Sequence, residues 1–404
     1  MKRKQRNKKF LAKLTVFSLL ILFGFLLGLR KEKLLEFLPG SFSRSTSLKV
    51  DKGEIISPRD LKKALSQKDF IFINVHTPYE GEVEKTDLFI DYDLLVANKD
   101  KLPQDKNSKI VLYCKTDRMS ADALATLKSL GYTNIKHLKG GMDAWRKQGF
   151  DLLDLTNLPS QVLPDQGFEL PISWGKVVPR LVALGVIDKE KFEKAVNMGE
   201  EEKLVFAGNV DIPIKINSQN SQFVVDVLWA LGLAQKSLVY EEGPMGREYK
   251  DRAGNFASTG GWTLAKGSAM THYNTHELIP LTAEDQIRVM EIAQNIYRPC
   301  CGNPTSFPDC NHGMAALAAI ELMVVKGLPD EEIYKNVLKL NSFWFSSHYL
   351  TLATSFVREG ISWDKVDAKL ALGSEYSSGN AAVKLNKKVG PLPFEANFAG
   401  GCGA

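Results

Sequence analysis

The stretch IVLYCKTDRMS, residues 110–120, decides the fold that we predict for the first half of this chain. Its first four residues, Ile110–Tyr113, are typical of a buried strand. Cys114 follows at once, and Ser120 is expected to cap a helix. A thiol at such a junction faces backbone N–H groups and the positive end of the helix dipole, and both stabilise a thiolate. Cys114 is therefore the predicted nucleophile, and Arg118 adds a fixed positive charge.

The residues on either side of this stretch alternate between strand and helix patterns. The sequence predicts helices over residues 57–65, 120–130 and 141–145, and strands over residues 70–75 and 135–138. Strands that alternate with helices are typical of a parallel sheet with helices on both faces. The fold class expected for this half is therefore α/β.

Length and composition set outer bounds on the organisation of the chain. With 404 residues, the chain is long enough for two domains in addition to an anchor. The apolar share of 44% and the charged share of 25% are ordinary for a globular protein. The net charge of +5 is concentrated at the N-terminus, at Lys2, Arg3, Lys4, Arg6, Lys8 and Lys9. The remainder is close to neutral, so the composition does not favour a nucleic-acid partner.

An apolar run directly follows this basic cluster. Residues 10–29 contain Lys13 as their only charged residue, and twenty helical residues span about 30 Å, the thickness of one hydrocarbon core. The excess of cations before the run predicts a single-pass membrane protein with its N-terminus in the cytoplasm and its domains outside it. The lipid bilayer is thus an expected partner. A cleavable signal peptide is the alternative interpretation.

These patterns divide the chain into six predicted parts. They are a basic N-terminus with a transmembrane helix (1–30), a linker (31–53), an α/β domain (54–153), a second linker (154–167), a mainly helical domain that contains Cys and His (168–385), and a flexible tail (386–404). The helical domain is predicted from apolar periodicity in residues 177–184, 223–231, 283–296, 314–325 and 342–357.

Residues 54–153 resemble a single rhodanese domain. The resemblance is carried by three segments in family order: FINVHTPYE at residues 72–80, the Cys114 loop, and LKGGMDAW at residues 138–145. It implies a sulfurtransferase fold in which Cys114 takes a sulfane sulfur as a persulfide and passes it to a thiophilic acceptor. The expected function is therefore sulfur transfer or thiol redox at Cys114, with a small sulfur compound or a thiol protein as the donor.

The resemblance also implies which residues bind the donor. The six-residue family loop maps onto residues 114–119, so Cys114 and Arg118 are the implied catalytic residues. The implied substrate-binding residues are Lys115, Thr116, Asp117, Met119 and Ser120.

Two departures from the family pattern keep a second interpretation open. The first strand ends Asn74-Val75-His76 where the family usually has Asp-Val-Arg, and the fourth loop position holds Asp117, whose carboxylate would repel an anionic donor. Some rhodanese modules serve only in binding or regulation. The alternative is therefore a non-catalytic rhodanese-fold module coupled to a metal-binding helical domain.

The C-terminal half resembles an uncharacterised domain that accompanies such modules, and this likeness implies no activity. Within it, residues 298–313 gather Cys300, Cys301, Cys310 and His312. Three thiols and an imidazole could bind zinc, copper or iron, although adjacent cysteines do not readily chelate one ion together. A disulfide between Cys310 and Cys300 or Cys301, and buried inert thiols, are the alternatives.

Cys402 is the last of five cysteines and lies in a glycine-rich terminus. A thiol on a mobile tail can reach distant partners. The hypothesis is that Cys402 relays sulfur or oxidising equivalents between Cys114 and the cysteines near residue 300; the alternative is a tail thiol without a role.

Overall fold

The structure is a computed structural model that describes residues 52–208 and 211–394. The predicted transmembrane segment, residues 10–29, and Cys402 lie outside the described residues. Within the described ranges, every helix is too short or too polar to span a bilayer.

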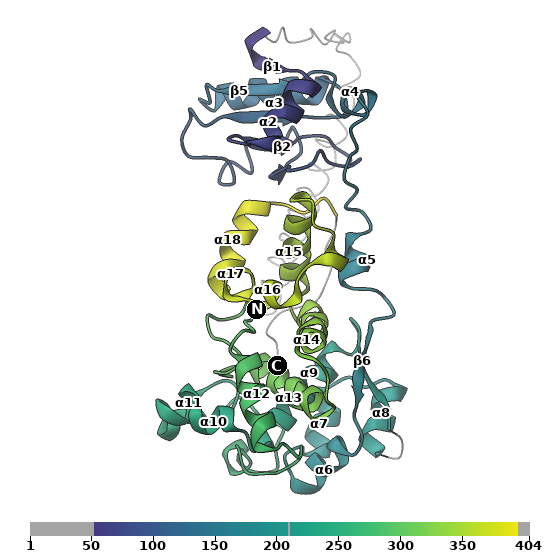
Figure 1. Cartoon of the computed structure of the whole chain (residues 1–404), viewed down its shortest axis with the longest axis vertical. Coiled ribbons are helices and arrows are strands. Elements are labelled where there is room, and N and C mark those ends of the chain that lie inside the picture. The colour runs from purple at the N-terminus through teal and green to yellow at the C-terminus, as the bar shows by residue number, and fades with distance from the viewer. Residues whose placement is uncertain (1–51, 209–210, 395–404) are drawn as a thin grey trace, which may run out of the picture. The chain divides into compact units, whose positions relative to one another are not determined.

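The first part of the described chain forms a five-stranded parallel sheet with helices (Figure 1). The sheet order is β1-β5-β4-β2-β3, and every pairing is parallel. The elements are η1 (Lys52–Glu54), β1 (Ile55–Ile56), α2 (Pro58–Ser66), β2 (Ile71–Asn74), β3 (Leu88–Phe89), β4 (Ile110–Tyr113), α3 (Arg118–Ser129), β5 (Ile135–Leu138) and α4 (Gly141–Lys147). The predicted α/β class of this part is confirmed.

Apolar side chains cover both faces of this sheet. On one face Leu112 packs in a cluster with Leu124 and Leu127 of α3. On the other face Val111 packs in a second cluster with Leu61 of α2 and Trp145 of α4. Successive residues of β4 therefore point to opposite faces, and both are buried, as expected for a central parallel strand.

The helix after Cys114 begins earlier than predicted. We expected Ser120 to cap it, but α3 starts at Arg118 with Asp117 in the N-cap position. The Ser120 hydroxyl instead bonds to the Asp117 carbonyl, at 3.1 Å, and to His137. Because its hydroxyl is already engaged, Ser120 cannot act as the cap, and the helix gains two residues at its start.

The expected linker, residues 154–167, is packed against the helical region. It contains the short helix α5 (Leu158–Val162), and Leu155, Leu158 and Val162 are buried in the core of that region. Its prolines and polar residues suggested an exposed connection, but three apolar side chains at close spacing give it a buried side.

The remainder is mainly helical, as predicted, with one small antiparallel sheet that was not predicted. The sheet pairs β6 (Phe168–Ser173) with β7 (Pro213–Ile216). The longer helices are α6 (Val177–Leu184), α7 (Lys189–Ala195), α8 (Glu200–Ala207), α9 (Ser221–Ala234), α12 (Ala283–Ala293), α13 (Asn311–Val325), α14 (Asp330–Trp344), α15 (Ser346–Arg358) and α18 (Gly379–Val389). The shorter ones are α10 (Leu238–Glu242), α11 (Pro244–Arg247), η2 (Lys250–Asn255), η3 (Ala269–Thr271), η4 (Trp363–Lys365), α16 (Ala368–Leu372) and α17 (Ser374–Ser377).

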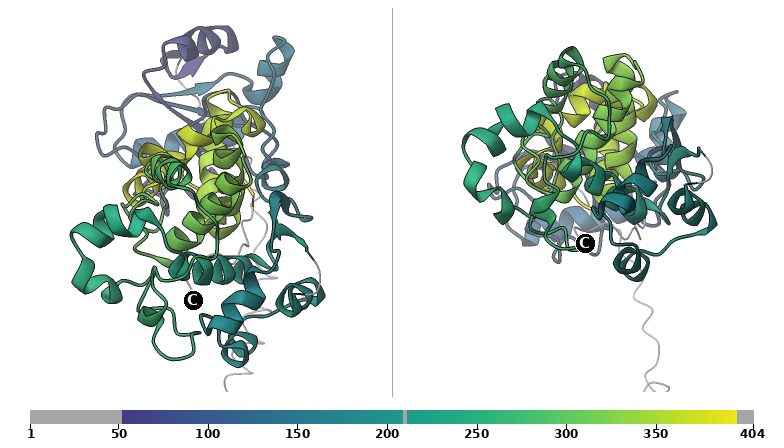
Figure 2. Two further views of the ribbon diagram at one scale, coloured as in Figure 1. Left: turned by 60° about the horizontal axis from the view of Figure 1, so that its bottom comes forward. Right: turned by 90° about the horizontal axis from the view of Figure 1, so that it is seen from below.

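Helices α9 and α13 form the centre of this region. Nearly every residue of both is buried, so they are apolar all round rather than on one stripe. Gly232 of α9 lies against the Met314 carbonyl, and a Cβ at residue 232 would come within 2.3 Å of that oxygen. Helices α12 and α14 pack against this pair, and α15 packs on α14; these helices are the green to yellow-green ribbons of Figure 2.

Two predicted boundaries in this region were wrong. Residues 342–357 belong to two helices, because Phe345 leaves the helical conformation and packs its ring 4.5 Å from that of His312. The expected tail from residue 386 begins inside α18, which runs to Val389 with its Leu385 and Val389 side chains buried.

A buried ion pair joins the sheet region to α15. The Arg358 guanidinium donates Nε and Nη2 to the two carboxylate oxygens of Glu82, both at 2.8 Å. Its Nη1 donates to the Asp87 carbonyl at 2.9 Å, while the Arg358 carbonyl accepts from Lys85 N–H at 2.9 Å. Glu82 and Arg358 are 0% and 4% exposed, so this contact lies away from water.

Candidate functional site

Cys114 lies at the carboxyl end of β4, between the central strand and the first turn of α3. The start of α4 holds its loop in place. The Cys114 carbonyl accepts a hydrogen bond from Met142 N–H at 2.9 Å, and the Lys115 carbonyl accepts from Asp143 N–H at 3.0 Å. The backbone of the loop is therefore fixed by two helices.

The Cys114 sulfur is buried rather than open to solvent. The residue is 1% exposed, and its Sγ donates to the Ser120 hydroxyl at 3.4 Å. We expected a reachable thiol, and the structure corrects this. Because α3 begins at Arg118, the third residue of the helix brings its hydroxyl over the sulfur.

Ser120 connects Cys114 to a histidine that the sequence analysis did not single out. The Ser120 Oγ lies 3.1 Å from Nδ1 of His137, which stands on β5 beside β4. Burial lowers the pKa of His137, so its imidazole is neutral near pH 7 and has a free lone pair for a proton. Ser120 Oγ thus lies between the Cys114 thiol and the His137 imidazole, while its own proton is donated to the Asp117 carbonyl.

The other predicted loop residues point in several directions. Arg118 faces outward, 3.8 Å from the Asp122 carboxylate and over the Tyr92 ring at 5.6 Å, with a side chain that is 60% exposed. It was expected to add charge at Cys114; its place in the first turn of α3 directs it instead to the next turn, where Asp122 lies.

The remaining predicted donor-binding residues are positioned as follows. Lys115 forms an ion pair with Glu80 at 2.6 Å, and Thr116 is exposed. The Asp117 carboxylate accepts a hydrogen bond from Gly140 N–H at 2.7 Å. The Met119 Sδ atom lies 3.4 Å from His76 Nδ1. The Asp117 carboxylate also lies 3.9 Å from His137 Nδ1. Most of these side chains therefore make contacts within the domain and are not free to bind a donor as they stand.

The comparisons with known proteins point to one family for this part of the chain. Residues 57–148 match the family model described as "Rhodanese-like domain". These residues form a rhodanese-like domain. The chain is 40% identical over 102 residues to the "Probable adenylyltransferase/sulfurtransferase MoeZ" of Mycobacterium tuberculosis, which covers 24% of this chain and 26% of the relative.

Two further proteins show the same extent of similarity. The chain is 32% identical over 108 residues to "Uncharacterized protein slr1261" of Synechocystis, covering 27% of this chain and 60% of that protein. A solved structure of the polysulfide-sulfur transferase of Wolinella succinogenes is 28% identical, with a TM-score of 0.22. The match covers 25% of this chain and 79% of that chain. The chain thus spans about a quarter of the first relative and three fifths of the second, and the likeness to the rhodanese-like domain is confined to part of this chain.

A second cluster lies in the helical region, between α12 and α13. The sulfur atoms of Cys300, Cys301 and Cys310 all lie within 4.8 Å of one another, and those of Cys300 and Cys310 are 3.7 Å apart. All three are free thiols. The structure therefore brings the three predicted cysteines together, including the adjacent pair.

His312 is not part of this thiol cluster. Its ring packs 4.5 Å from the Phe345 ring, and its Nδ1 lies 2.8 Å from the Asn311 side-chain oxygen. Burial lowers the pKa of His312 to about 4, so the imidazole is neutral. As the second residue of α13, His312 points its ring toward the turn between α14 and α15, not toward the sulfurs.

A buried arginine underlies the three thiols. Arg298 is 0% exposed, and its Nη2 donates to Cys301 Sγ at 3.3 Å and to Asp309 Oδ1 at 3.0 Å. The other Asp309 oxygen accepts from the Asn303 amide at 2.8 Å. Arg298 stands two residues before Cys300 in the sequence, but its burial beneath the thiols was not predicted.

The three thiols do not share their protons equally. The pKa of the Cys310 thiol lies well below its ordinary value, because Cys300 and Cys301 donate hydrogen bonds to its sulfur and Arg298 is close. The pKa of the Cys300 thiol is raised, first by its contact with Cys301 and then by that with Cys310. Cys310 is also the N-cap residue of α13.

Replacing Gly313 by alanine is expected to displace Arg298 and to destabilise the fold by about 1–3 kcal/mol. A Cβ at residue 313 would lie 2.8 Å from the guanidinium carbon, and a fully buried side chain has little room to move. Urea unfolding measures the effect. The matched control is Gly302→Ala in the same segment, where a Cβ meets no atom within 4 Å. Equal effects for the two variants would contradict this account.

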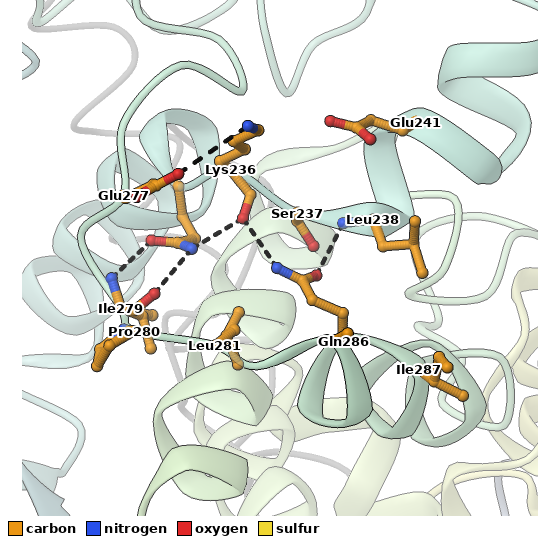
Figure 3. A pocket seen from close by; sticks show the side chains of 12 residues that line it. Lys236, Ser237, Leu238, Glu241, Glu277, Ile279, Pro280, Leu281, Gln286 and Ile287 are labelled. Carbon is orange, nitrogen blue, oxygen red and sulfur yellow. Dashed lines mark hydrogen bonds and ion pairs between the residues drawn. The ribbon is translucent and has the colours of Figure 1, made fainter.

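The helical region also contains a cavity of about 460 Å³ beside the start of α12 (Figure 3). Its glutamines are already bound to backbone groups: Gln235 accepts from Leu278 and Ile279 N–H, and Gln286 accepts from Leu238 N–H. Lys236 and Glu277, 4.0 Å apart, supply charge at its edge. Its polar groups mainly tie loops together, so this cavity does not carry the functional argument.

Proposed function

We propose that the rhodanese-like domain carries a sulfane sulfur on Cys114. The observation that supports this most is the chain from Cys114 Sγ through Ser120 Oγ to His137 Nδ1, with steps of 3.4 and 3.1 Å. A thiol must lose its proton to become a nucleophile, and these atoms lead to a neutral imidazole once the Ser120 hydroxyl turns from the Asp117 carbonyl to His137. The name of a relative, a probable adenylyltransferase/sulfurtransferase, agrees with this chemistry.

In the proposed reaction the Ser120 hydroxyl first turns its proton from the Asp117 carbonyl to His137 Nδ1; the Cys114 proton then passes to Ser120 while the Ser120 proton passes to His137. The thiolate attacks the outer sulfur of thiosulfate, the S–S bond of the donor breaks, and sulfite leaves with the electron pair. A persulfide remains on Cys114. A thiophilic acceptor such as cyanide then takes the outer sulfur and regenerates the thiolate. Because Cys114 is 1% exposed, the turn at residues 117–120 must move before the donor reaches the sulfur, and we expect slow turnover.

Conversion of thiosulfate and cyanide to thiocyanate, with mass spectrometry of the intact protein, tests this proposal. Cys114→Ser is expected to abolish both turnover and the added sulfur atom. Ser120→Ala is expected to slow turnover by about 10²-fold or more, since it interrupts the proton path. Ser129→Ala is the matched control, because Ser129 lies on the same helix and bonds only to the Thr126 carbonyl of that helix. Full turnover by Cys114→Ser would refute the proposal.

The second candidate function is a non-catalytic binding module, and the burial of Cys114 together with the outward position of Arg118 favours it. In this alternative the partner helical region holds a soft metal ion at its cysteine cluster. Alkylation of the native protein separates the two functions. A Cys114 that resists a small alkylating reagent, in a protein that accepts no sulfur from thiosulfate, would support the binding module.

We further propose that residues 10–29 anchor the protein in a membrane, with the N-terminus cytoplasmic and the later domains outside. The basic cluster before this segment and its apolar composition support the proposal. Retention of the full chain in carbonate-washed membranes, and digestion of the domains by protease added from the outside, are the expected results. Release by carbonate would contradict the anchor.

The relay role of Cys402 remains a proposal with a direct test. If Cys402 takes part in sulfur passage, Cys402→Ser is expected to slow repeated turnover while leaving the first persulfide on Cys114 intact. Unchanged repeated turnover would remove Cys402 from the scheme.

A further inference from the structure

The three thiols near residue 300 lie close together, and one of their sulfur–sulfur distances matches the edge of a metal–thiolate site. Zinc binds thiolate sulfur at about 2.3 Å in tetrahedral geometry, which places neighbouring sulfur atoms about 3.8 Å apart. The Cys300 and Cys310 sulfurs are 3.7 Å apart, and Cys301 lies within 4.8 Å of both. A disulfide needs about 2.05 Å and involves two sulfurs, not three. The three sulfurs are thus close enough together to share one ion.

The surroundings of the cluster favour negative charge on sulfur. Arg298 is fully buried, permanently charged, and donates directly to Cys301 Sγ at 3.3 Å. Cys310 is the N-cap residue of the fifteen-residue helix α13, whose first N–H groups carry partial positive charge. Three thiolates and the Asp309 carboxylate, set against Arg298, leave a net charge of about −3. A divalent ion reduces this charge to about −1, and a monovalent ion leaves more of it uncompensated.

We propose that Cys300, Cys301 and Cys310 bind one Zn²⁺ ion as thiolates, with the fourth coordination position open to an exogenous ligand. The described side chains nearest the cluster are already engaged: both Asp309 oxygens accept hydrogen bonds, and His312 packs on Phe345. Cys300 is exposed, so the remaining position faces solvent and takes water or a small thiolate. Three protein ligands with one open position are typical of reactive rather than purely structural zinc sites.

Binding changes no oxidation state. Each thiol exchanges its proton for a sulfur–zinc bond, so one Zn²⁺ displaces up to three protons to the buffer. Arg298 acts as a positioning residue, because its N–H group holds Cys301 Sγ toward the other two sulfurs and stabilises its thiolate.

The test uses the full chain, purified under reducing conditions and titrated with Zn²⁺ alone and with Co²⁺ alone. We expect about one ion per chain, proton release on binding, and for Co²⁺ the sulfur-to-metal charge-transfer and visible absorption of a tetrahedral thiolate site. Cys300→Ser is expected to weaken Zn²⁺ binding by at least about 100-fold. Because Cys300 is exposed, this variant is expected to fold, and circular dichroism checks that it does.

Cys114→Ser is the matched control, since it removes a thiol from the rhodanese-like domain and is expected to leave zinc binding unchanged. This control also separates the present proposal from sulfur transfer: either can fail while the other holds. Retention of full zinc affinity by Cys300→Ser would overturn the proposal. A native protein that binds no zinc and whose mass is lower by two hydrogens, because Cys300 and Cys310 form a disulfide, would also overturn it. A protein that binds Cu⁺ and not Zn²⁺ would overturn it as well.

Discussion

Replacing Arg358 by methionine is expected to lower the free energy of unfolding by about 3–5 kcal/mol. The substitution keeps an apolar side chain of similar length but removes both hydrogen bonds to Glu82. Glu82 is 0% exposed and would remain as a buried anion without a cation. The substitution would also remove the Arg358 Nη1 donor from the Asp87 and Val389 carbonyls. Urea or guanidinium unfolding of the described domains measures the loss.

The control is an exposed ion pair close to this contact. Lys388 and Glu359 lie 3.1 Å apart with side chains that are 56% and 53% exposed, so Lys388→Met is expected to cost less than about 1 kcal/mol. Adding Glu82→Leu to Arg358→Met should recover part of the stability, because no buried charge is then left unpaired. Equal losses for Arg358→Met and Lys388→Met would show that burial does not strengthen the pair.

Replacing Glu321 by glutamine is expected to stabilise the fold increasingly as the pH rises from about 5 to 8. Glu321 on α13 is fully buried, and its carboxylate oxygens have no hydrogen-bond partner among the described residues. Burial raises the pKa of Glu321 from its ordinary value of 4.5 to about 8, and the nearby Ser237 hydroxyl offsets this only in part. The folded protein therefore favours the protonated form of this carboxyl up to about pH 8.

The sign of the pH dependence follows from the two protonation states. Between pH 4.5 and 8 the folded protein holds a proton on Glu321 that the unfolded chain has lost, so wild-type stability falls with rising pH. Glutamine does not titrate, and its advantage should grow by about 1.4 kcal/mol per pH unit, to a total of about 3–5 kcal/mol above pH 8. Unfolding curves at several pH values measure this. Glu291→Gln on the exposed side of α12 is the control, and a pH-independent difference for Glu321→Gln would contradict the assignment.

Local patterns predicted the elements whose boundaries depend on neighbours in the chain. β4 at residues 110–113 and α6 at residues 177–184 lie where they were predicted. The apolar run of β4 ends at Cys114, and α6 ends at Gly185, which has the left-handed conformation that stops a helix. The helix after Cys114 began two residues early, since the partner that engages Ser120 is on another strand.

The contacts between residues far apart in the chain could not be predicted from the sequence. The short strands β1 and β3 have two residues each and are defined by their neighbours, not by their own composition. Glu82 and Arg358 are 276 residues apart, and each separately resembles an exposed charge. No local periodicity connects them, because periodicity describes one element at a time.

The candidate sites show the same division. The position of Cys114 after its strand was readable from the sequence, but its burial and its link through Ser120 to His137 depend on the register of β4 with β5. Proximity in the chain predicted the grouping of Cys300, Cys301 and Cys310. The position of the buried Arg298 beneath them could not be predicted, because it depends on how closely Gly313 of α13 approaches the Arg298 guanidinium.

The joining of Glu82 to Arg358 limits how such a protein can be rearranged during evolution. Rhodanese-like modules occur in proteins of varied architecture, as the partial coverage of the relatives illustrates. A gene fusion that moved this module elsewhere would separate Glu82 from the Arg358 guanidinium that pairs with it. In its new surroundings Glu82 would then need either water or a new cation beside it. The rhodanese-like module of this chain is therefore adapted, at residue 82, to the helical region that follows it.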